Sequence, residues 1–434
     1  MPTAVLARCG AARTTHRRLN QQGSENQMSE IANDQPQPEE VSDHGEPVDR
    51  RRTSDPDFGG EPPSVPTSEK PEKGPTALTD RERILRRVID TPEDDTPRLV
   101  FADWLDEHGD RDDDPARAEF IRLQCEPGSD PVLARPRRAR EQKLLTAHAA
   151  RWASKVGSDL DAKFRRGFVD EVRMAAADYL EQAVRIHVSP VTRLQLLGER
   201  YEEDGVALSM IPVLPEFGAI EELTLESPVP DVLHPRSGKV PDRLRALGFA
   251  GFDTDPGGAT AVLAASWTSG VKRLAFVQTA IAQRWVRAIR YASAQLTLEC
   301  LEVTAGRIST TGAADLAQLP FPQLKRVSLA GTQLSPAGIG SLLMAGWMGG
   351  VEELDLTGTW KGDEVALAVA ASPRVGNLRR LVIHNCGLTD LAAFALAGCG
   401  YLDRLEQLVL NVGNNFTPAG VAALRKRFGA RVTV

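Results

Sequence analysis

The sequence has no long apolar run and few cysteines. No stretch of about eighteen or more apolar residues occurs, which excludes an ordinary transmembrane helix and predicts that the membrane is not a partner. The five cysteines show no C-x-x-C pairing, which excludes a zinc site of the paired-cysteine type. Their odd number and wide scatter predict reduced thiols in a cytoplasmic protein.

An excess of basic charge and the common catalytic motifs are also missing. The formal net charge is −7, so the chain as a whole has no electrostatic attraction to nucleic acid, and none is expected as a partner. No phosphate-binding glycine motif, nucleophile elbow, zinc-binding helix motif or kinase motif occurs. The glycines of residues 248–251 and 255–258 are interpreted as turns between repeats. We therefore predict no enzymatic activity, no cofactor and no metal.

The first 76 residues lack aromatic residues, except for Phe58, and lack a periodic apolar pattern. Residues 29–76 are rich in Pro, Glu, Asp and Ser, so they bury too little apolar surface to offset the entropy of ordering. Residues 1–76 are predicted to be a disordered tail. The basic start has no apolar core of a secretory signal. An organellar transit peptide or a translation start at Met28 instead of Met1 remains open.

What is present is a repeat. The pattern L-x-x-L-x-L, with Val, Ile, Phe or Met allowed, recurs at 27-residue intervals from Leu324 through Val351 and Leu378 to Leu405. Earlier copies begin at Val169, Val191, Ile220, Leu244, Val271 and Leu298. A regular period of this length is typical of a solenoid, and it predicts about ten repeats within residues 164–434.

Each repeat has the pattern of a strand followed by a helix. Side chains alternate faces along a strand, so the fourth and sixth positions point inward and the third, fifth and seventh point outward. Ser335-Pro336 and Thr417-Pro418 predict helix starts, because a capping hydroxyl precedes a proline at the first helical position. Residues 337–345 and 363–371 carry apolar residues at helical spacing. Stacked repeats then share one core.

The repeat resembles leucine-rich repeats of the ribonuclease-inhibitor type. The longer signature L-x-x-L-x-L-x-x-N/C-x-L is matched in full by Leu378 to Leu388, with Cys386 at the N/C position. Other copies carry Thr279, Gly306, Thr332, Thr359 or Gly413 there, so small or hydroxylated residues must fill the turn. The resemblance implies an α/β horseshoe with a parallel sheet on the concave side and helices on the convex side.

Residues 77–157 have a helical pattern. Thr79 and Glu82 form a capping box, and Thr96-Pro97 and Asp114-Pro115 start two further helices. Gly109 is expected to end the second helix as a left-handed C-cap. A fourth helix is expected over about residues 138–156.

This segment resembles a small bacterial module called the repeat-companion domain, which is found ahead of repeat regions. The resemblance rests on residues 97–99, 103–105, 107–109 and 117–122, and the acidic run at residues 111–114 departs from it. It implies no known activity. Because the end of a solenoid exposes apolar surface, we expect an all-α N-terminal cap that joins the repeats through residues 164–172.

Several isolated residues admit a chemical role and a structural one. The acidic cluster from Asp103 to Asp114 could hold a hard cation, but its spacing differs from an EF-hand loop, and Asp103 and Asp106 are assigned to a solvated helix face. His108 is interpreted as a helix-end residue. Cys300, at a third strand position, is expected to be exposed, and Cys386 to be a structural turn residue.

The candidate binding site is the outward face of the last strands. It comprises Arg326, Ser328, Glu353, Asp355, Thr357, Arg380, His384, Gln407 and Asn411, with Val382 and Val409 between them. Arg326, Glu353 and Arg380 alternate in charge on strands roughly 4.8 Å apart. Two interpretations remain open: a ladder in which these charges satisfy one another, or a mixed-charge patch that selects a partner.

The sequence therefore predicts a non-catalytic scaffold that binds an unidentified protein through the concave face, in a bacterial cytoplasm. An alternative hypothesis gives the companion domain an unassigned activity or docking role and leaves target selection to the repeats. A third, from fold analogy alone, is an accessory regulator of a nucleotide-dependent enzyme. The partner and the oligomeric state are not determined by the sequence.

Overall fold

The computed structural model describes residues 78–125, 134–157, 160–197, 210–226, 243–251, 257–359 and 362–434. The chain divides into two compact units, residues 1–73 and 74–434, and every described residue belongs to the second. The tail predicted over residues 1–76 lies outside the described residues. None of the helices in the described part is long and apolar enough to cross a membrane.

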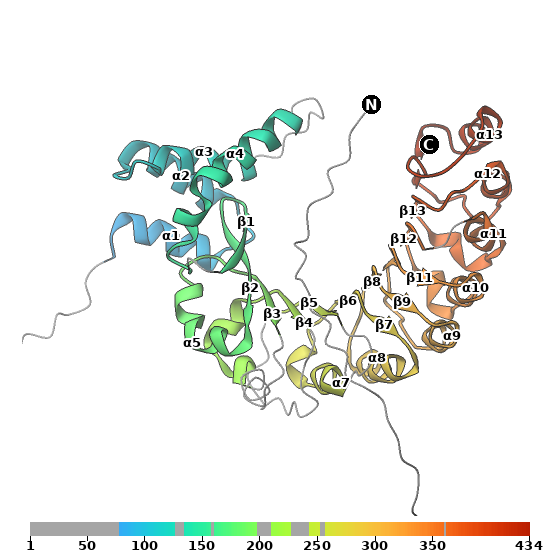
Figure 1. Cartoon of the computed structure of the whole chain (residues 1–434), viewed down its shortest axis with the longest axis horizontal. Helices are drawn as coiled ribbons and strands as arrows, with labels where there is room; N and C mark the ends of the chain where they lie inside the picture. The colour runs from blue at the N-terminus through green and yellow to red at the C-terminus, as the bar shows by residue number, and fades with distance from the viewer. Residues whose placement is uncertain are drawn as a thin grey trace, which may run out of the picture. The chain divides into compact units, whose positions relative to one another are not determined.

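The N-terminal part of the described chain is helical (Figure 1). Its helices are α1 (Asp80–Asp90), α2 (Thr96–His108), α3 (Asp114–Cys125) and α4 (Ala134–Ala153). The Thr79 hydroxyl accepts a hydrogen bond from the Glu82 backbone N–H, and the Glu82 carboxylate accepts one from the Thr79 backbone N–H at 2.9 Å. The predicted capping box is confirmed. Helix α4 begins four residues before the predicted start at Arg138.

Gly109 ends α2, but not in the predicted conformation. Its φ of −62° and ψ of 129° are extended and not left-handed. The close approach of other atoms requires a glycine here, because a Cβ atom would lie 2.3 Å from the Leu105 carbonyl oxygen and 2.8 Å from Asp114 Cβ. The chain leaves the helix directly towards the start of α3.

A long sheet follows, and it is parallel except at its first pair. Its strands are β1 (Asp161–Arg165), β2 (Phe168–Ala175), β3 (Arg193–Leu197), β4 (Glu222–Glu226), β5 (Ala246–Ala250), β6 (Arg273–Val277), β8 (Cys300–Thr304), β10 (Arg326–Ser328), β12 (Glu353–Asp355), β13 (Arg380–Val382), β14 (Gln407–Val409) and β15 (Val432–Thr433), which lie side by side in this order. Each of the ten predicted copies supplies one strand, from β2 to β14. The register follows the repeat, since Leu354 pairs with Val327 on one side and with Leu381 on the other.

The two edge strands of the sheet, β1 and β15, were not predicted from the sequence. Strand β1 pairs antiparallel with β2, and β15 pairs parallel with β14. The predicted join at residues 164–172 is therefore a hairpin, with its turn at Arg166 and Gly167. Neither edge carries the repeat pattern, so the periodicity could not indicate them.

The glycine-bearing segment at residues 248–251 is not a turn, as the sequence analysis expected. Gly248 lies within β5 and pairs with Thr224 on β4 and Ala275 on β6. A Cβ atom at Gly248 would lie 2.8 Å from Thr224 Oγ1, so glycine makes room for the neighbouring strand. Only Gly251, with φ of +73°, has a left-handed conformation. Of the second expected turn, residues 255–256 lie outside the described residues, and Gly257 begins α7.

Helices follow the strands and lie along one face of the sheet (Figure 1). They are α5 (Ala176–Ile186), α7 (Gly257–Leu263), α8 (Gln283–Gln295), α9 (Thr310–Ala317), α10 (Pro336–Leu343), α11 (Glu364–Ala371), α12 (Asp390–Gly398) and α13 (Pro418–Phe428), with short 3₁₀ segments at Ile211–Val213, Pro215–Ala219, Ser266–Thr268, Gly346–Gly350, Pro373–Asn377 and Gly429–Arg431. A small second sheet joins β7 (Ala280–Ile281), β9 (Arg307–Ile308) and β11 (Gln333–Leu334). Ser335 and Thr417 cap α10 and α13 through their hydroxyls, as predicted.

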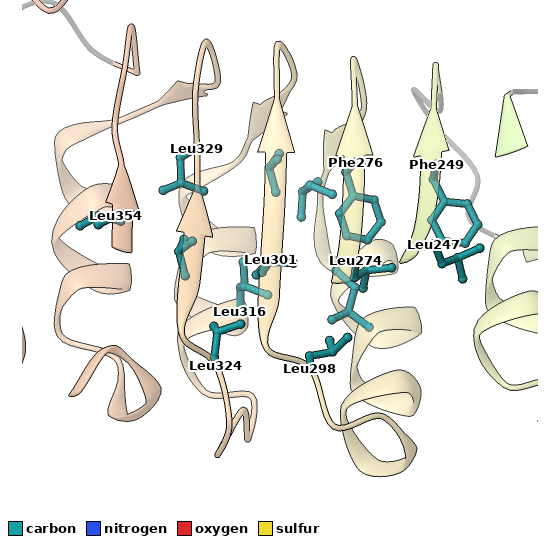
Figure 2. Close-up of a cluster of buried hydrophobic side chains, with 14 of the residues drawn as sticks. Leu247, Phe249, Leu274, Phe276, Leu298, Leu301, Leu316, Leu324, Leu329 and Leu354 are labelled. Atoms are coloured by element: carbon teal, nitrogen blue, oxygen red, sulfur yellow. The ribbon is translucent and has the colours of Figure 1, made fainter. Parts of the chain in front are cut away.

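The main core lies between this sheet and the helices. Leu247, Leu274, Leu301 and Leu354 occupy equivalent strand positions and are at most 1% exposed. Figure 2 shows them in one row across neighbouring strands, with Leu316 of α9 close by. Burial of each such side chain contributes roughly 1.5–3 kcal/mol. Since the row continues from repeat to repeat, the repeats stabilise one another.

Hydroxyl and thiol groups fill the turns where many such repeats carry asparagine. Thr332 donates to the Val303 carbonyl at 2.6 Å, Thr359 donates to Leu356 at 2.8 Å, and the Cys386 thiol contacts the Leu356 carbonyl at 3.4 Å. Gly306 takes no side chain, because a Cβ there would lie 2.3 Å from the Thr279 carbonyl oxygen. The prediction of small or hydroxylated turn residues, with Cys386 in a structural role, is confirmed.

The helical segment packs on the β1–β2 hairpin. Arg166 donates to the Pro92 carbonyl at 2.9 Å and lies 3.0 Å from the Asp95 carboxylate. The Gly167 backbone N–H donates to Gln124 Oε1 at 2.7 Å. Phe168 joins an apolar cluster with residues of α1, α2 and α3. The first strands and the helices therefore share buried surface.

Candidate functional site

The side chains at third, fifth and seventh strand positions form the face of the sheet opposite the helices, here named the open face. All nine predicted binding residues are accessible. Arg326, Glu353, Arg380, Gln407 and Asn411 are exposed, and Ser328, Asp355, Thr357 and His384 are half-buried. The third-position side chains lie in one row, because Arg326, Glu353, Arg380 and Gln407 pair in register on successive strands.

A depression on the open face brings five of the nine together. Its volume is about 390 Å³, and its predicted lining residues are Arg326, Ser328, Glu353, Asp355 and Arg380. Thr357, His384, Gln407 and Asn411 are not among its lining residues. The five predicted lining residues stand on β10, β12 and the start of β13.

Five further residues line the depression. Val327 and Leu354 stand at inward fourth positions, and the sequence analysis did not assign the other three to the binding site. Arg273 and Cys300 stand at third positions and Glu302 at a fifth position, all on the two preceding strands. The same positional rule that selected the nine residues would have selected these three if it had been extended by two repeats.

Cys300 is buried, which corrects the expectation that it is exposed. Only 4% of the residue is accessible, because its short side chain sits in register between Arg273 and Arg326 on the neighbouring strands. Its thiol lies 3.4 Å from Glu302 Oε1. Burial, together with the Glu302 carboxylate, raises the pKa of the thiol to about 12. The thiol therefore stays protonated near neutral pH, which is opposite to the activation of a nucleophilic cysteine.

Charges on the N-terminal strands of the open face are paired with one another. Arg273 lies 2.9 Å from Glu222 and 2.8 Å from Glu302, and Arg173 lies 2.9 Å from Glu226. Although burial alone raises the pKa of Glu302, hydrogen bonds and charge from Arg273 lower it below the usual value. The charged side chains on these strands therefore form ion pairs with one another.

A second ladder of ion pairs runs one residue before the predicted row. Lys325 lies 3.0 Å from Glu352, and Arg379 lies 3.8 Å from Glu352 and 2.5 Å from Glu406. In contrast, Arg326 and Glu353 form no ion pair with any residue of the described ranges. The ladder of ion pairs is therefore formed by residues at the second positions of these repeats, and not by those at the third positions.

Two valines follow Asp355 in register on the next two strands. Val382 lies in register between Asp355 and Val409, and it is only 4% exposed although its position is outward. Further along the same strand, His384 Nε2 is buried and has no hydrogen-bond partner in the described part of the chain. The open face thus combines free charge with some apolar surface.

The acidic cluster of the helical segment does not form a metal centre in the described part of the chain. Asp103 and Asp106 are exposed and each lies 2.7 Å from Arg122, as suits a solvated helix face. Asp113 and Asp114 are buried instead. Within the described ranges, no three carboxylate, histidine or cysteine side chains gather as metal ligands. His108 stacks on Trp104, with ring centroids 5.6 Å apart.

Comparisons with known proteins give the chain no family. No protein-family model and no curated protein matches it. Among solved structures, the yeast Rad7–Elc1 complex matches at 13% identity over 80% of this chain and 85% of that one, with a TM-score of 0.38. An internalin from Listeria monocytogenes matches at 15% identity over 55% of this chain and 66% of its own, with a TM-score of 0.30. The strand register, and not these distant likenesses, is the support for leucine-rich repeats.

Proposed function

We propose that this chain is a non-catalytic protein-binding scaffold that uses the concave, open face of a leucine-rich-repeat solenoid. The solenoid comprises residues 164–434 and curves as a horseshoe with its helices on the convex side. The binding surface is centred on Arg326, Glu353 and Arg380. The proposal places the protein in the cytoplasm and assigns it no metal or cofactor.

The observation that carries the proposal is the contrast between paired and unpaired charge. Arg326, Glu353 and Arg380 are exposed, and none of them forms an ion pair within the described ranges. Arg380 only donates to Gln407 Oε1 at 2.9 Å. The paired ladder one residue earlier already provides a charged surface. Free charges of alternating sign favour a partner of complementary pattern over the ladder interpretation.

The surroundings of these charges suit a protein partner. Ser328, Asp355 and Thr357 supply hydroxyl and carboxylate groups, and His384 Nε2 lacks a hydrogen-bond partner among the described residues. Val409, which is half-buried and pairs in register with the buried Val382, supplies some apolar surface beside them. A specific interface typically buries about 800 Å² on each side, so a partner would also cover neighbouring strands, including Gln407 and Asn411.

The helical segment, residues 77–157, is proposed to be a repeat-companion domain that caps the first repeat. Its contacts with Arg166, Gly167 and Phe168 support this role. A cap would shield apolar surface that an unpaired terminal repeat exposes.

The decisive test is affinity capture from a native lysate with three baits. The first is the full chain, and the second carries Arg326→Glu, Glu353→Lys and Arg380→Glu. The third, a matched control, carries Lys325→Glu, Glu352→Lys and Arg379→Glu. Both variants change the net charge by the same amount. Each substituted site in the control lies one residue before the corresponding site in the second bait. The control therefore alters the paired ladder and leaves the predicted row unchanged. Circular dichroism confirms that all three are folded.

We expect a protein that is captured by the first and third baits and lost from the second. The loss should correspond to about tenfold or more in affinity, since reversed charges meet like charges on the partner. Equal capture by all three baits would contradict the proposal.

A second candidate function assigns the docking role to the helical segment, with the repeats selecting the target. The observation that favours it is a cavity where this segment meets the sheet. Capture of the same partner by the second bait, but not by a chain that lacks residues 1–157, would support this candidate over the first.

A further inference from the structure

The cavity lies at the junction of α1, α3 and α4 with β2 and has a volume of about 290 Å³. We name it the junction cavity. The cationic side chains that line it are Arg81, Arg111, Arg117, Arg151 and Lys155. None of them belongs to the open face, so the cavity is separate from the proposed binding surface. Its size is near the lower end for small-molecule sites.

The two carboxylates of the junction cavity are already engaged. Asp114 is 2% exposed and lies 3.0 Å from Arg81 Nη2. Asp113 is 6% exposed, accepts a hydrogen bond from Trp152 Nε1 at 2.8 Å, and lies 3.1 Å from Arg151 Nη2. Asp113 and Asp114 also attract Arg117 through space, but two carboxylates against five cationic side chains leave the lining of the cavity with an excess of positive charge. Arg111, Arg117 and Lys155 form no ion pair with either carboxylate within the described ranges.

Arg117 is the most constrained of those three cations. Its guanidinium lies 4.6 Å from the ring centre of Trp152 and 5.1 Å from that of Phe168. The residue as a whole is partly accessible, but its Nη1 atom is buried and has no hydrogen-bond partner among the described residues. A buried donor on a charged group is costly unless an acceptor meets it.

The electrostatic surroundings reinforce this requirement. Burial lowers the pKa of Arg117 to about 9; the charges of Asp113 and Asp114 oppose this lowering, and the charge of Arg81 adds to it. Burial and the charges of Arg111 and Arg81 lower the pKa of Lys155. The cations therefore repel one another, and an anion between them would relieve that repulsion.

We infer that the junction cavity binds a small tetrahedral dianion of the phosphate class, either inorganic phosphate or a small phosphate monoester. A dianion matches the excess of positive charge better than a single carboxylate does. Its several oxygens can accept from Arg117 Nη1 together with the Arg111 and Lys155 side chains. Planar guanidinium groups are well suited to phosphate oxygens.

The test is isothermal titration calorimetry of the full chain with inorganic phosphate, with glycerol 3-phosphate and, at matched ionic strength, with acetate. We expect one phosphate-class ion to bind per chain, and acetate to bind at least about tenfold more weakly. A preference for the monoester over inorganic phosphate would identify an organic ligand. Binding of acetate as strong as that of phosphate, or no phosphate binding up to about 20 mM, would overturn the inference.

Arg117→Met is the informative variant, because it removes the charge and keeps an apolar stem beside Trp152. We expect it to weaken phosphate binding by about tenfold or more. The matched control is Arg140→Met, which removes one arginine of α4 that pairs with Glu119 outside the cavity and should leave binding unchanged. If Arg117→Met is not folded, Lys155→Met at the exposed rim should weaken binding by about fivefold. If Arg117 only packs against Trp152 and Phe168 and does not contact the anion, Arg117→Met and Lys155→Met will bind phosphate as strongly as Arg140→Met does.

Discussion

At the residue scale, the described part of the chain holds a histidine that folding keeps neutral. His187 Nε2 lies 3.0 Å from the Tyr179 hydroxyl at the end of α5. Burial lowers the pKa of His187 from 6.5 to about 4, although the charge of Glu216 raises it slightly. Because the unfolded chain binds this proton more readily than the folded chain, acid should favour unfolding.

The expected effect has a defined sign and pH range. Above about pH 6.5 His187 is neutral in both states and the full stability is present, and stability falls as the pH drops towards 4. Between pH 7.5 and 5 the loss should be about 1 to 2 kcal/mol, with allowance for partial solvent access. Urea unfolding at both pH values, with the native chain and with His187→Gln, measures it. The variant should lose less stability on acidification. An equal loss in the native chain and in the variant would show that His187 is not responsible.

At the scale of elements, the β1–β2 turn and the helices make opposite demands on glycine. Gly167 has φ of +85°, and a Cβ atom there would lie 2.4 Å from Ile121 Cγ1 on α3. Gly340 lies within α10, where a Cβ atom would meet nothing within 4 Å. The hairpin turn needs glycine for a close contact, and the helix gains nothing from it.

The same substitution should therefore have opposite effects at the two sites. We expect Gly167→Ala to destabilise the chain by about 2 kcal/mol or more, because the turn must move away from α3. Gly340→Ala should stabilise it by about 0.5 to 1 kcal/mol through helix propensity and lower entropy of the unfolded chain. Thermal unfolding of the two variants provides the comparison. If both variants change stability in the same direction, the packing of the hairpin turn described above is wrong.

At the scale of the whole molecule, the two ends of the long sheet are treated differently. The first strand, β1, forms a hairpin with β2. The turn of this hairpin packs on α3, and Phe168 of β2 is buried in a cluster with residues of α1, α2 and α3. The last strand, β15, pairs with β14, and its Val432 packs against the main core without a cap of helices like α1 to α3 in the described part of the chain. The helical segment therefore contributes to the stability of the N-terminal repeats.

Removal of residues 1–159 tests this contribution. A chain that begins at residue 160 keeps β1 but exposes Phe168 and leaves Arg166 without the Pro92 carbonyl and the Asp95 carboxylate. We expect a lower unfolding midpoint and increased binding of an apolar dye, since newly exposed apolar surface costs about 25 cal/mol per Å². The control lacks only residues 1–77 and should match the full chain. If the shorter chain is equally stable, the helical segment is an independent domain and not a cap.

Local features of the sequence were sufficient for the repeating strands and for several helix starts. The repeat pattern located ten strands, and Thr79, Ser335 and Thr417 located helix starts, because periodicity and capping depend on neighbouring residues. Positional alternation also identified nine residues that do reach solvent on the open face. The conformation of Gly109 and the strand at Gly248 were mispredicted, because close contacts with Asp114 of α3 and with Thr224 of the neighbouring strand constrain these positions.

By itself, the sequence determined the repeat period, the alternation of faces and the chemistry of the turns. Only the tertiary structure decided which charges pair, why Cys300 is buried, how the sheet edges are completed and where five cations surround one cavity. The physical reason is that pairing and burial depend on distances between side chains on different strands and helices. A shift of one position moves a charge from the paired ladder to the free row, although the two residues are neighbours in the sequence.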